Sequence, residues 1–542
     1  MRRALAVLVA GTLAAGGCAE EPNSPISEPE QPAAAATTPA PTQPPEPRLA
    51  WGPTEAELQQ AMADAAELSD EAAAGQVIVA RYDGTEPATA AQLVTDYHLG
   101  GVILFSQNIA SLDQVSATSA AVQEAVAATR QWPAMVAVDN EGGLVQRLSG
   151  DVGPWTSYPP LLSAGAASDA PDVITAAYQA MAAELVASGI TTNFAPVADV
   201  TVGPSDVTIG TRSAGSDPQR VAQVVVAASA GFSAGGVLSS VKHFPGHGSL
   251  NVDSHLRLPV LDTPTAELVN RDLVPFAAGV DAGSPMVMVG HIAVTDWDPD
   301  VPATLSPAAY SYLRDQLGFT GVAVTDALDM GALTATWSSE QIAVMALNAG
   351  ADLLLVPGDV AAAHGGIMDA LADGTLSRDR LTQAAGRVIA MLRWQRQLAA
   401  AATPAPVGSA GPAAQALAAA AITMVAGQCS AAVVGGTVRL QGGTASERQL
   451  LTTGLTAAGV DVVDPAQTLV VLADRDWSGG SADVVVALDS PYVLTGARAD
   501  TVIAAYSDTP TSLNALVAVL TGSATATGRL PVTVGDLPAS VC

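Results

Sequence analysis

One short stretch of the chain concentrates residues that can do chemistry. Lys242 is the only lysine among 542 residues, and it begins the sequence KHFPGHG, which Asp253-Ser254-His255 follows closely. Three of the chain's six histidines lie in this region. An ammonium group can bind polar groups of a ligand, and an imidazole can exchange protons near neutral pH. We therefore expect this stretch to bind a ligand and to carry acid-base chemistry.

Asp253 and His255 are separated by a single residue. In an extended loop such residues point the same way, so Asp253 can bind one ring nitrogen and leave the other to transfer a proton. The clustered histidines have two alternative interpretations, a zinc site or a purely structural role. The chain has no HExxH-like spacing to support zinc, so neither a metal nor an organic cofactor is expected. His247, inside the tight loop, is expected to be structural or to support the residues that contact the ligand.

Short β-branched runs alternate with longer Ala-rich segments from about residue 70, which is typical of repeated βα units. Eight such runs over about 300 residues predict a (β/α)₈ TIM-type barrel. They are Gln76–Ala80, Gly101–Phe105, Met135–Asp139, Thr191–Ala195, Leu238–His243, Met286–His291, Gly321–Asp326 and Ala351–Val356.

The polar residues that stand out lie at the carboxyl ends of these runs. Asp139 ends the third run, Lys242 and His243 the fifth, His291 the sixth and Asp326 the seventh. Catalytic groups of such barrels lie at the carboxyl ends of the strands, so we expect these side chains to meet at one mouth. His291 is expected at the rim or in a subsite of that site.

The domain organisation follows from changes in composition. We expect a signal peptide over 1–18, a Pro/Ala-rich disordered tether over 19–50, the catalytic barrel over 51–398 and a linker over 399–412. A helix is expected over 377–397. The remaining residues, 413–542, predict a smaller α/β sandwich domain with apolar runs at 431–434, 468–473, 483–488 and 501–505 and a helix over 447–458.

Charge and cysteine content limit the partners and the compartment. With 52 acidic against 22 basic residues, the chain lacks the basic surface that nucleic acid requires. Cys18 follows an apolar, small-residue segment and is a candidate for lipidation, with an ordinary signal peptide as the alternative. The only expected membrane contact is this lipid anchor, on the outer face of the cell membrane. Cys429 and Cys542 can form a disulfide after export, but two cysteines alone leave their pairing open.

The motifs KHFPGHG and DSH, with AVDNEGGLVQRL before them and VTDALDMGAL after them, resemble glycoside hydrolase family 3. Within it, they are similar to the bacterial β-N-acetylglucosaminidases that include the NagZ-type enzymes of peptidoglycan recycling. The resemblance runs from about residue 70 to 400. It continues more weakly through LDSPYVL, VIAAYSDTP and TGRLPV into the second domain.

The resemblance implies roles for individual residues. Asp326 corresponds to a nucleophile that forms a covalent glycosyl-enzyme, and His255, oriented by Asp253, corresponds to the acid/base. The nearby Asp329 is expected to cap a helix instead. Sugar binding is implied for a further set of residues, with a surface ion pair as the alternative for Arg212: Asp139, Arg147, Arg212, Lys242 and His243.

The implied activity is that of a retaining exo-β-N-acetylglucosaminidase acting on GlcNAc-containing glycans or muropeptides from the cell wall. Three alternatives remain: a phosphorylase of the same family, a β-glucosidase or β-xylosidase, and a non-catalytic wall-binding lipoprotein. Leu144 and Gln107 stand where related sequences often carry arginine, which leaves the aglycone side undefined.

Overall fold

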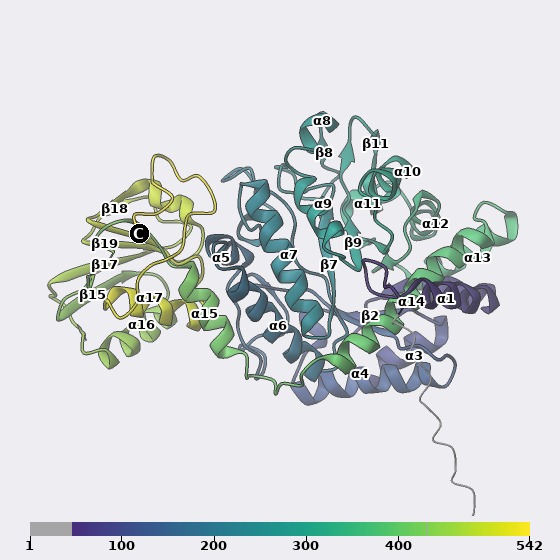
Figure 1. Ribbon diagram of the computed structural model, residues 1–542, viewed down its shortest axis with the longest axis horizontal. Coiled ribbons are helices and arrows are strands. Elements are labelled where there is room, and N and C mark those ends of the chain that lie inside the picture. The colour runs from purple at the N-terminus through teal and green to yellow at the C-terminus, as the bar shows by residue number, and fades with distance from the viewer. Residues whose placement is uncertain (1–45, 430) are drawn as a thin grey trace, which may run out of the picture. The chain divides into compact units, whose positions relative to one another are not determined.

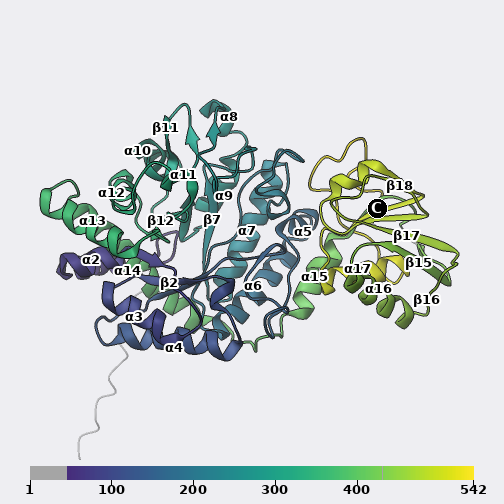
Figure 2. The same ribbon diagram turned by 180° about the vertical axis from the view of Figure 1, so that it is seen from behind.

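Eight parallel strands form the largest sheet of the computed structural model, in the order β12-β9-β7-β6-β3-β2-β1-β13 (Figures 1 and 2). An isolated parallel bridge between Val324 and Leu353 connects the two ends of this order, so the sheet is a nearly closed barrel. The predicted barrel is confirmed, with each strand at one of the eight predicted runs. The bounds are β1 Ile78–Ala80, β2 Gly101–Leu104, β3 Met135–Val138, β6 Thr192–Asn193, β7 Leu238–Phe244, β9 Met286–Val289, β12 Val322–Thr325 and β13 Leu354–Leu355.

Helices follow the strands along the chain and cover the outside of the barrel, as α6 and α7 do in Figure 1. Every residue of the eight strands is buried, which agrees with a parallel sheet that is covered on both faces. The helices between the strands and after the last one are α3 Pro87–Tyr97, α4 Leu112–Ala127, α5 Leu161–Ala166, α6 Pro171–Ala187, α7 Pro218–Ala234, α8 Thr265–Leu268, α9 Val274–Asp281, α10 Pro307–Ser311, α11 Gly331–Thr334, α12 Ser339–Ala349, α13 Val360–Asp373 and α14 Arg378–Ala401. Two more precede the first strand: α1 Glu55–Glu67 and α2 Asp70–Gln76.

Local sequence signals set where these helices begin. The Asp217 side chain accepts a hydrogen bond from the Arg220 backbone N–H, and Pro218 occupies the first position of α7. An aspartate cap followed by proline satisfies an otherwise unpaired N–H and preorganises the first turn. The helix therefore starts at a fixed point after the loop that carries Arg212.

The second α/β domain has a six-stranded sheet in the order β14-β21-β19-β17-β15-β16, and only β14 in it is antiparallel. Its strands are β14 Thr423–Ala426, β15 Thr437–Gly442, β16 Asp461–Val462, β17 Thr468–Ala473, β19 Val484–Ala487 and β21 Thr501–Ala504, and its helices are α15 Gly411–Ala421, α16 Ala445–Ala457 and α17 Pro510–Leu520. The run at 431–434 was expected to be a strand and is not. The strand lies at β15 instead.

The structure describes residues 46–429 and 431–542. The expected signal peptide, Cys18 and most of the expected tether lie outside them. The last residues of that tether are ordered: Arg48 Nη1 donates to the Gly52 carbonyl at 2.9 Å, and its guanidinium lies 4.4 Å from the centre of the Trp394 ring. Helix α14 runs four residues past its predicted end, which shortens the expected linker. Among the described helices, none has the length and apolar character needed to cross a membrane.

Candidate active site

A cavity of about 270 Å³ lies at the carboxyl ends of the barrel strands. This is the end at which TIM barrels carry their catalytic groups. All of its lining residues fall between Arg81 and Val356, so the barrel alone forms it. The ionisable residues that line it are Arg81, Asp139, Glu141, Arg147, Arg212, Lys242, His243, His247, His255, Asp326 and Asp329.

Lys242 and His243 both reach this cavity although they are neighbours on one strand. Neighbouring side chains on a regular strand point to opposite faces. The pairing of β7 with β9 shifts register between Val241 and Phe244, and such irregularities redirect side chains next to active sites. Lys242 is 2% exposed, and its Nζ lies 2.7 Å from Asp139 Oδ1 and 2.8 Å from Glu141 Oε1.

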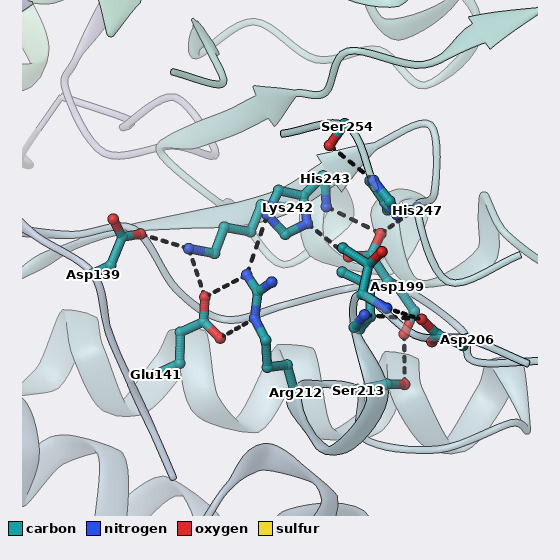
Figure 3. A network of polar contacts seen from close by, with 12 residues as sticks. Asp139, Glu141, Asp199, Asp206, Arg212, Ser213, Lys242, His243, His247 and Ser254 are labelled. Carbon is teal, nitrogen blue, oxygen red and sulfur yellow. Dashed lines mark hydrogen bonds and ion pairs between the residues drawn. The ribbon is translucent and has the colours of Figure 1, made fainter. Parts of the chain in front are cut away.

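Glu141 connects Lys242 with a second cation, Arg212 (Figure 3). It lies on β4 (Asn140–Gly142), which pairs with β5 (Val145–Gln146) directly after β3. Arg212 donates to both carboxylate oxygens, from Nε at 2.8 Å and from Nη2 at 2.9 Å. Burial alone raises the pKa of Glu141, but the charges of Arg212 and Lys242 outweigh it and hold this pKa well below its usual range. Arg212 is therefore part of a buried network and not of a surface ion pair.

Asp199 orients the histidine next to Lys242. Its Oδ2 lies 2.7 Å from His243 Nδ1, and its Oδ1 accepts the His247 backbone N–H at 2.7 Å. Burial raises the pKa of Asp199, but the neighbouring His243 outweighs this effect and lowers it, so the carboxylate is ionised and accepts the Nδ1 hydrogen. The Nε2 of His243 then faces Arg212 Nη2 at 3.4 Å, a group that can only donate.

Asp326 follows β12 and lines the cavity. Its Oδ1 accepts the Ala327 backbone N–H at 2.8 Å. Burial raises the pKa of Asp326, but the nearby His243 and His291 rings and this backbone hydrogen bond outweigh it, so the pKa lies below its usual range. The carboxylate is thus held in its charged form, in which it can act as a nucleophile or accept hydrogen bonds.

The Asp253 and His255 side chains meet as expected, with Asp253 Oδ1 2.7 Å from His255 Nδ1. The backbone between them is a turn, and the expected extended conformation is wrong: the His255 backbone N–H also donates to Asp253 Oδ1 at 2.9 Å. His255 lines the cavity while its side chain stays 64% exposed. Because Asp253 occupies Nδ1, Nε2 is the ring nitrogen free to transfer a proton.

Two other charged residues of the cavity differ from expectation. Asp329 does not cap a helix: α11 begins without a side-chain cap, and Asp329 pairs with Arg81 at 2.5 Å. Arg147 has no hydrogen-bond or ion-pair partner among residues 46–429 and 431–542, and its Nε is buried. Arg147 is thus a cation of the cavity wall that forms no ion pair with the residues that the structure describes.

His291 is fully buried and does not line the cavity, so the expected place at the rim or in a subsite is wrong. Sequence reasoning also missed Glu141, Asp199 and Arg81. Asp199 and Arg81 follow the fourth and first predicted strands, so the strand-end rule that selected Asp139 would have found them. Glu141 had a weaker signal, its place in the EGG motif.

Two remaining expectations concern cysteines and metals. The structure joins Cys429 and Cys542 in a disulfide with their Cα atoms 5.4 Å apart. In the part of the chain that the structure describes, no three His, Cys, Asp or Glu side chains group as they would to hold a metal ion.

The cavity thus combines a buried cluster of charged residues around Lys242, the carboxylate of Asp326 and the histidine of the Asp253–His255 pair. Comparison with known proteins identifies the family in which these groups occur. The pattern of the glycosyl hydrolase family 3 N-terminal domain matches residues 69–391. The chain belongs to glycosyl hydrolase family 3. This membership confirms the resemblance and assigns the chain to the glycoside hydrolases.

Named relatives of this family member are bacterial hexosaminidases. Beta-hexosaminidase A of Pseudoalteromonas piscicida is 36% identical over 289 residues, which are 50% of this chain and 48% of that protein. The beta-hexosaminidase of Xylella fastidiosa is 38% identical over 272 residues, 48% of this chain and 77% of that protein. This chain thus matches about half the length of the first relative and about three quarters of the second.

Two solved structures share the fold over different lengths of the chain. A family 3 beta-N-acetylglucosaminidase from a Paenibacillus species superposes with a TM-score of 0.76 at 28% identity, covering 88% of this chain and 100% of that one. The beta-N-acetylhexosaminidase of Beutenbergia cavernae is 34% identical with a TM-score of 0.55, covering 60% of this chain and 99% of that one. The two-domain architecture therefore occurs in this family.

Proposed function

We propose that the chain is a retaining exo-β-N-acetylglucosaminidase that removes terminal GlcNAc from cell-wall-derived glycans. One observation carries this proposal: Asp326 and His255, the partner of Asp253, line the same cavity. Lys242 lines it too, with its partners Asp139 and Glu141. The hexosaminidase relatives and the Paenibacillus structure support the choice of sugar. A cavity of about 270 Å³ is smaller than pockets for drug-sized ligands, so it suits a single terminal sugar.

The residues divide the reaction between them. In the first step Asp326 attacks the anomeric carbon while Nε2 of His255 gives its proton to the leaving glycosidic oxygen, which forms a glycosyl ester and frees the aglycone. In the second step His255 takes a proton from water, whose oxygen attacks the same carbon and releases Asp326. Two inversions retain the configuration.

The sugar hydroxyls have suitable partners. Asp139 accepts from Lys242 through Oδ1, so its second oxygen can accept hydroxyl hydrogens of the sugar. The guanidinium of Arg147 lines the same cavity and supplies donors for hydroxyl oxygens. We assign Asp139, Arg147, Arg212, Lys242 and His243 to substrate binding, with Arg212 acting through its contact with Glu141 and His243.

Hydrolysis of a panel of 4-nitrophenyl glycosides tests this function. We expect turnover of the β-N-acetylglucosaminide, far slower turnover of the β-glucoside and β-xyloside, and loss of activity in Asp326→Ala. Turnover of the β-glucoside alone would make the chain a β-glucosidase. No turnover of any glycoside, with retained binding to cell-wall glycan, would support the non-catalytic alternative.

A second candidate is a phosphorylase that uses phosphate in place of water. The Arg147 guanidinium, which has no ion-pair partner among residues 46–429 and 431–542, favours it, since a guanidinium binds phosphate in a forked geometry. His255 adds no negative charge that would repel an anion. A beta-glucoside phosphorylase also shares the fold, at 20% identity and a TM-score of 0.75. Formation of GlcNAc-1-phosphate in phosphate buffer would identify this activity.

We also propose that Cys18 carries a lipid that anchors the exported protein to the outer face of the membrane. The apolar segment that precedes Cys18 supports this proposal. Fractionation of cells that express the wild type and Cys18→Ser tests it. Recovery of both proteins in the membrane fraction would contradict it.

A further inference from the structure

His291 is the buried histidine that the proposed reaction does not use. It follows β9, is 0% exposed and lies beside the loop that carries Asp326. Its two ring nitrogens each have one partner: Nε2 lies 2.8 Å from the Ala327 carbonyl oxygen, and Nδ1 lies 2.7 Å from Thr304 Oγ1. Neither partner is a carboxylate, so the ring is not held by an ion pair.

The contact with Ala327 fixes the hydrogen on the ring. A carbonyl oxygen can only accept, so Nε2 of His291 carries a hydrogen in every protonation state that allows this contact. Burial lowers the pKa of His291, which favours the neutral ring with this single Nε2 hydrogen. His291 therefore acts as a directed donor to the residue that follows Asp326.

Thr304 lies on the other side of the ring, close to the end of β9. Thr304 Oγ1 lies 3.0 Å from the Val289 carbonyl and 2.9 Å from the Gly290 carbonyl. The Asp326 backbone N–H donates to the same Val289 carbonyl at 3.0 Å. A neutral His291 ring with its hydrogen on Nε2 accepts the single Thr304 hydroxyl hydrogen at Nδ1, so Thr304 holds the ring in place. Two hydrogen bonds then connect the ends of β9 and β12, one from the Asp326 N–H to Val289 and one from His291 Nε2 to Ala327.

Ala327 is held at both of its backbone groups. Its N–H donates to Asp326 Oδ1 at 2.8 Å, and its carbonyl accepts from His291. A rotation of this residue would move the N–H that fixes the Asp326 carboxylate. We infer that His291 is a positioning residue, which holds Ala327 and thereby aims the Asp326 carboxylate into the cavity.

This inference rests on the proposed nucleophilic role of Asp326. Small displacements of a reacting group can cost about 100-fold in rate. In His291→Leu we therefore expect kcat for the 4-nitrophenyl β-N-acetylglucosaminide to fall about 100-fold, with KM changed less than threefold. His291→Gln places an amide N–H at a similar reach and should recover at least tenfold of that loss.

The same series separates positioning from a general structural role. Thr304→Val removes the hydroxyl at nearly constant volume and should lower kcat without changing KM, whereas Thr304→Ser should behave as the wild type. If His291→Leu does not fold, the Thr304 pair decides the question. A kcat within twofold of the wild type in His291→Leu or Thr304→Val, or a Gln variant no better than Leu at equal thermal stability, would overturn the inference. An inactive wild type would instead contradict the proposed function.

Discussion

At the scale of single residues, Asp253 and Asp326 have opposite surroundings. Asp326 is held by a backbone N–H among buried imidazoles, whereas the Asp253–His255 pair remains open to solvent. Burial raises the pKa of Asp253, but the backbone and ring hydrogen bonds from His255 outweigh it and lower this pKa. Asp253 therefore remains an ionised acceptor for Nδ1, which leaves Nε2 for the proposed proton transfer.

We expect His255→Ala to slow the reaction in a way that depends on the leaving group. General acid catalysis contributes about 10²–10⁴-fold, and most of that benefit goes to poor leaving groups. kcat/KM should thus fall strongly for a methyl or disaccharide β-N-acetylglucosaminide and much less for the 4-nitrophenyl compound. An equal fall in kcat/KM for all leaving groups would contradict the proposed role of His255 as the general acid.

At the scale of elements, the loop with His255 is docked onto the segment that follows Asp326. Ser254 Oγ lies 3.0 Å from His247 Nε2, and the Ser254 carbonyl accepts the Ala332 N–H of α11 at 3.2 Å. The His255 carbonyl accepts the Gly331 N–H at 3.1 Å. The buried Ser254 therefore fixes the turn that holds Asp253 and His255, and His255 lines the cavity.

Ser254→Ala should loosen this turn without unfolding the protein. A neutral hydrogen bond contributes about 1 kcal/mol, so we expect a small fall in Tm and a several-fold fall in kcat. The exposed Ser481 of the second domain provides the matched control, Ser481→Ala, which should change neither quantity. An unchanged kcat in Ser254→Ala would show that the docking is dispensable.

The same elements show how far sequence reasoning reaches. Strand positions followed from β-branched runs, and the strand-end rule placed Asp139, Lys242 and Asp326 together, because both depend on local sequence and barrel geometry. The pairing of Arg81 with Asp329, 248 residues apart, and the burial of His291 depend on tertiary packing. The turn at Asp253-Ser254-His255 arises because the Asp253 carboxylate binds the His255 backbone as well as its ring.

At the scale of the whole molecule, one buried carboxylate ties the amino-terminal end of the barrel together. Asp352 precedes β13 and accepts from Arg314 at 2.5 Å, Arg387 at 3.1 Å and Arg380 at 3.2 Å. Burial raises the pKa of Asp352, but the three guanidinium charges outweigh it and lower this pKa. Removing the carboxylate would leave these cations unpaired.

Asp352→Ala should destabilise the fold by about 3–5 kcal/mol, measured by urea denaturation. Because the pKa of Asp352 is lowered on folding, its contribution is complete above the ordinary carboxyl pKa of about 3.9 and is lost as the pH falls below it. The difference in the free energy of unfolding between wild type and variant should therefore become smaller below about pH 4. A difference that does not change with pH would contradict the role of the Asp352 charge.

The disulfide acts on the second domain and not on the cavity. It links residues 113 positions apart, and its removal typically costs about 2–5 kcal/mol. Because the barrel alone lines the cavity, Cys429→Ser with Cys542→Ser should lower the Tm but leave kcat at low temperature within twofold of the wild type. A large loss of kcat in a folded variant would show that the second domain supports catalysis.

Trapping of the glycosyl-enzyme is the most direct test of the proposed hydrolase. A fluorinated GlcNAc donor with a good leaving group slows the second step, so the intermediate should accumulate and be located by digestion and mass spectrometry. We predict a single glycosyl adduct on the peptide that contains Asp326, absent from Asp326→Ala. An adduct on another residue, or turnover by Asp326→Ala at the wild-type rate, would contradict the assignment of Asp326 as the nucleophile.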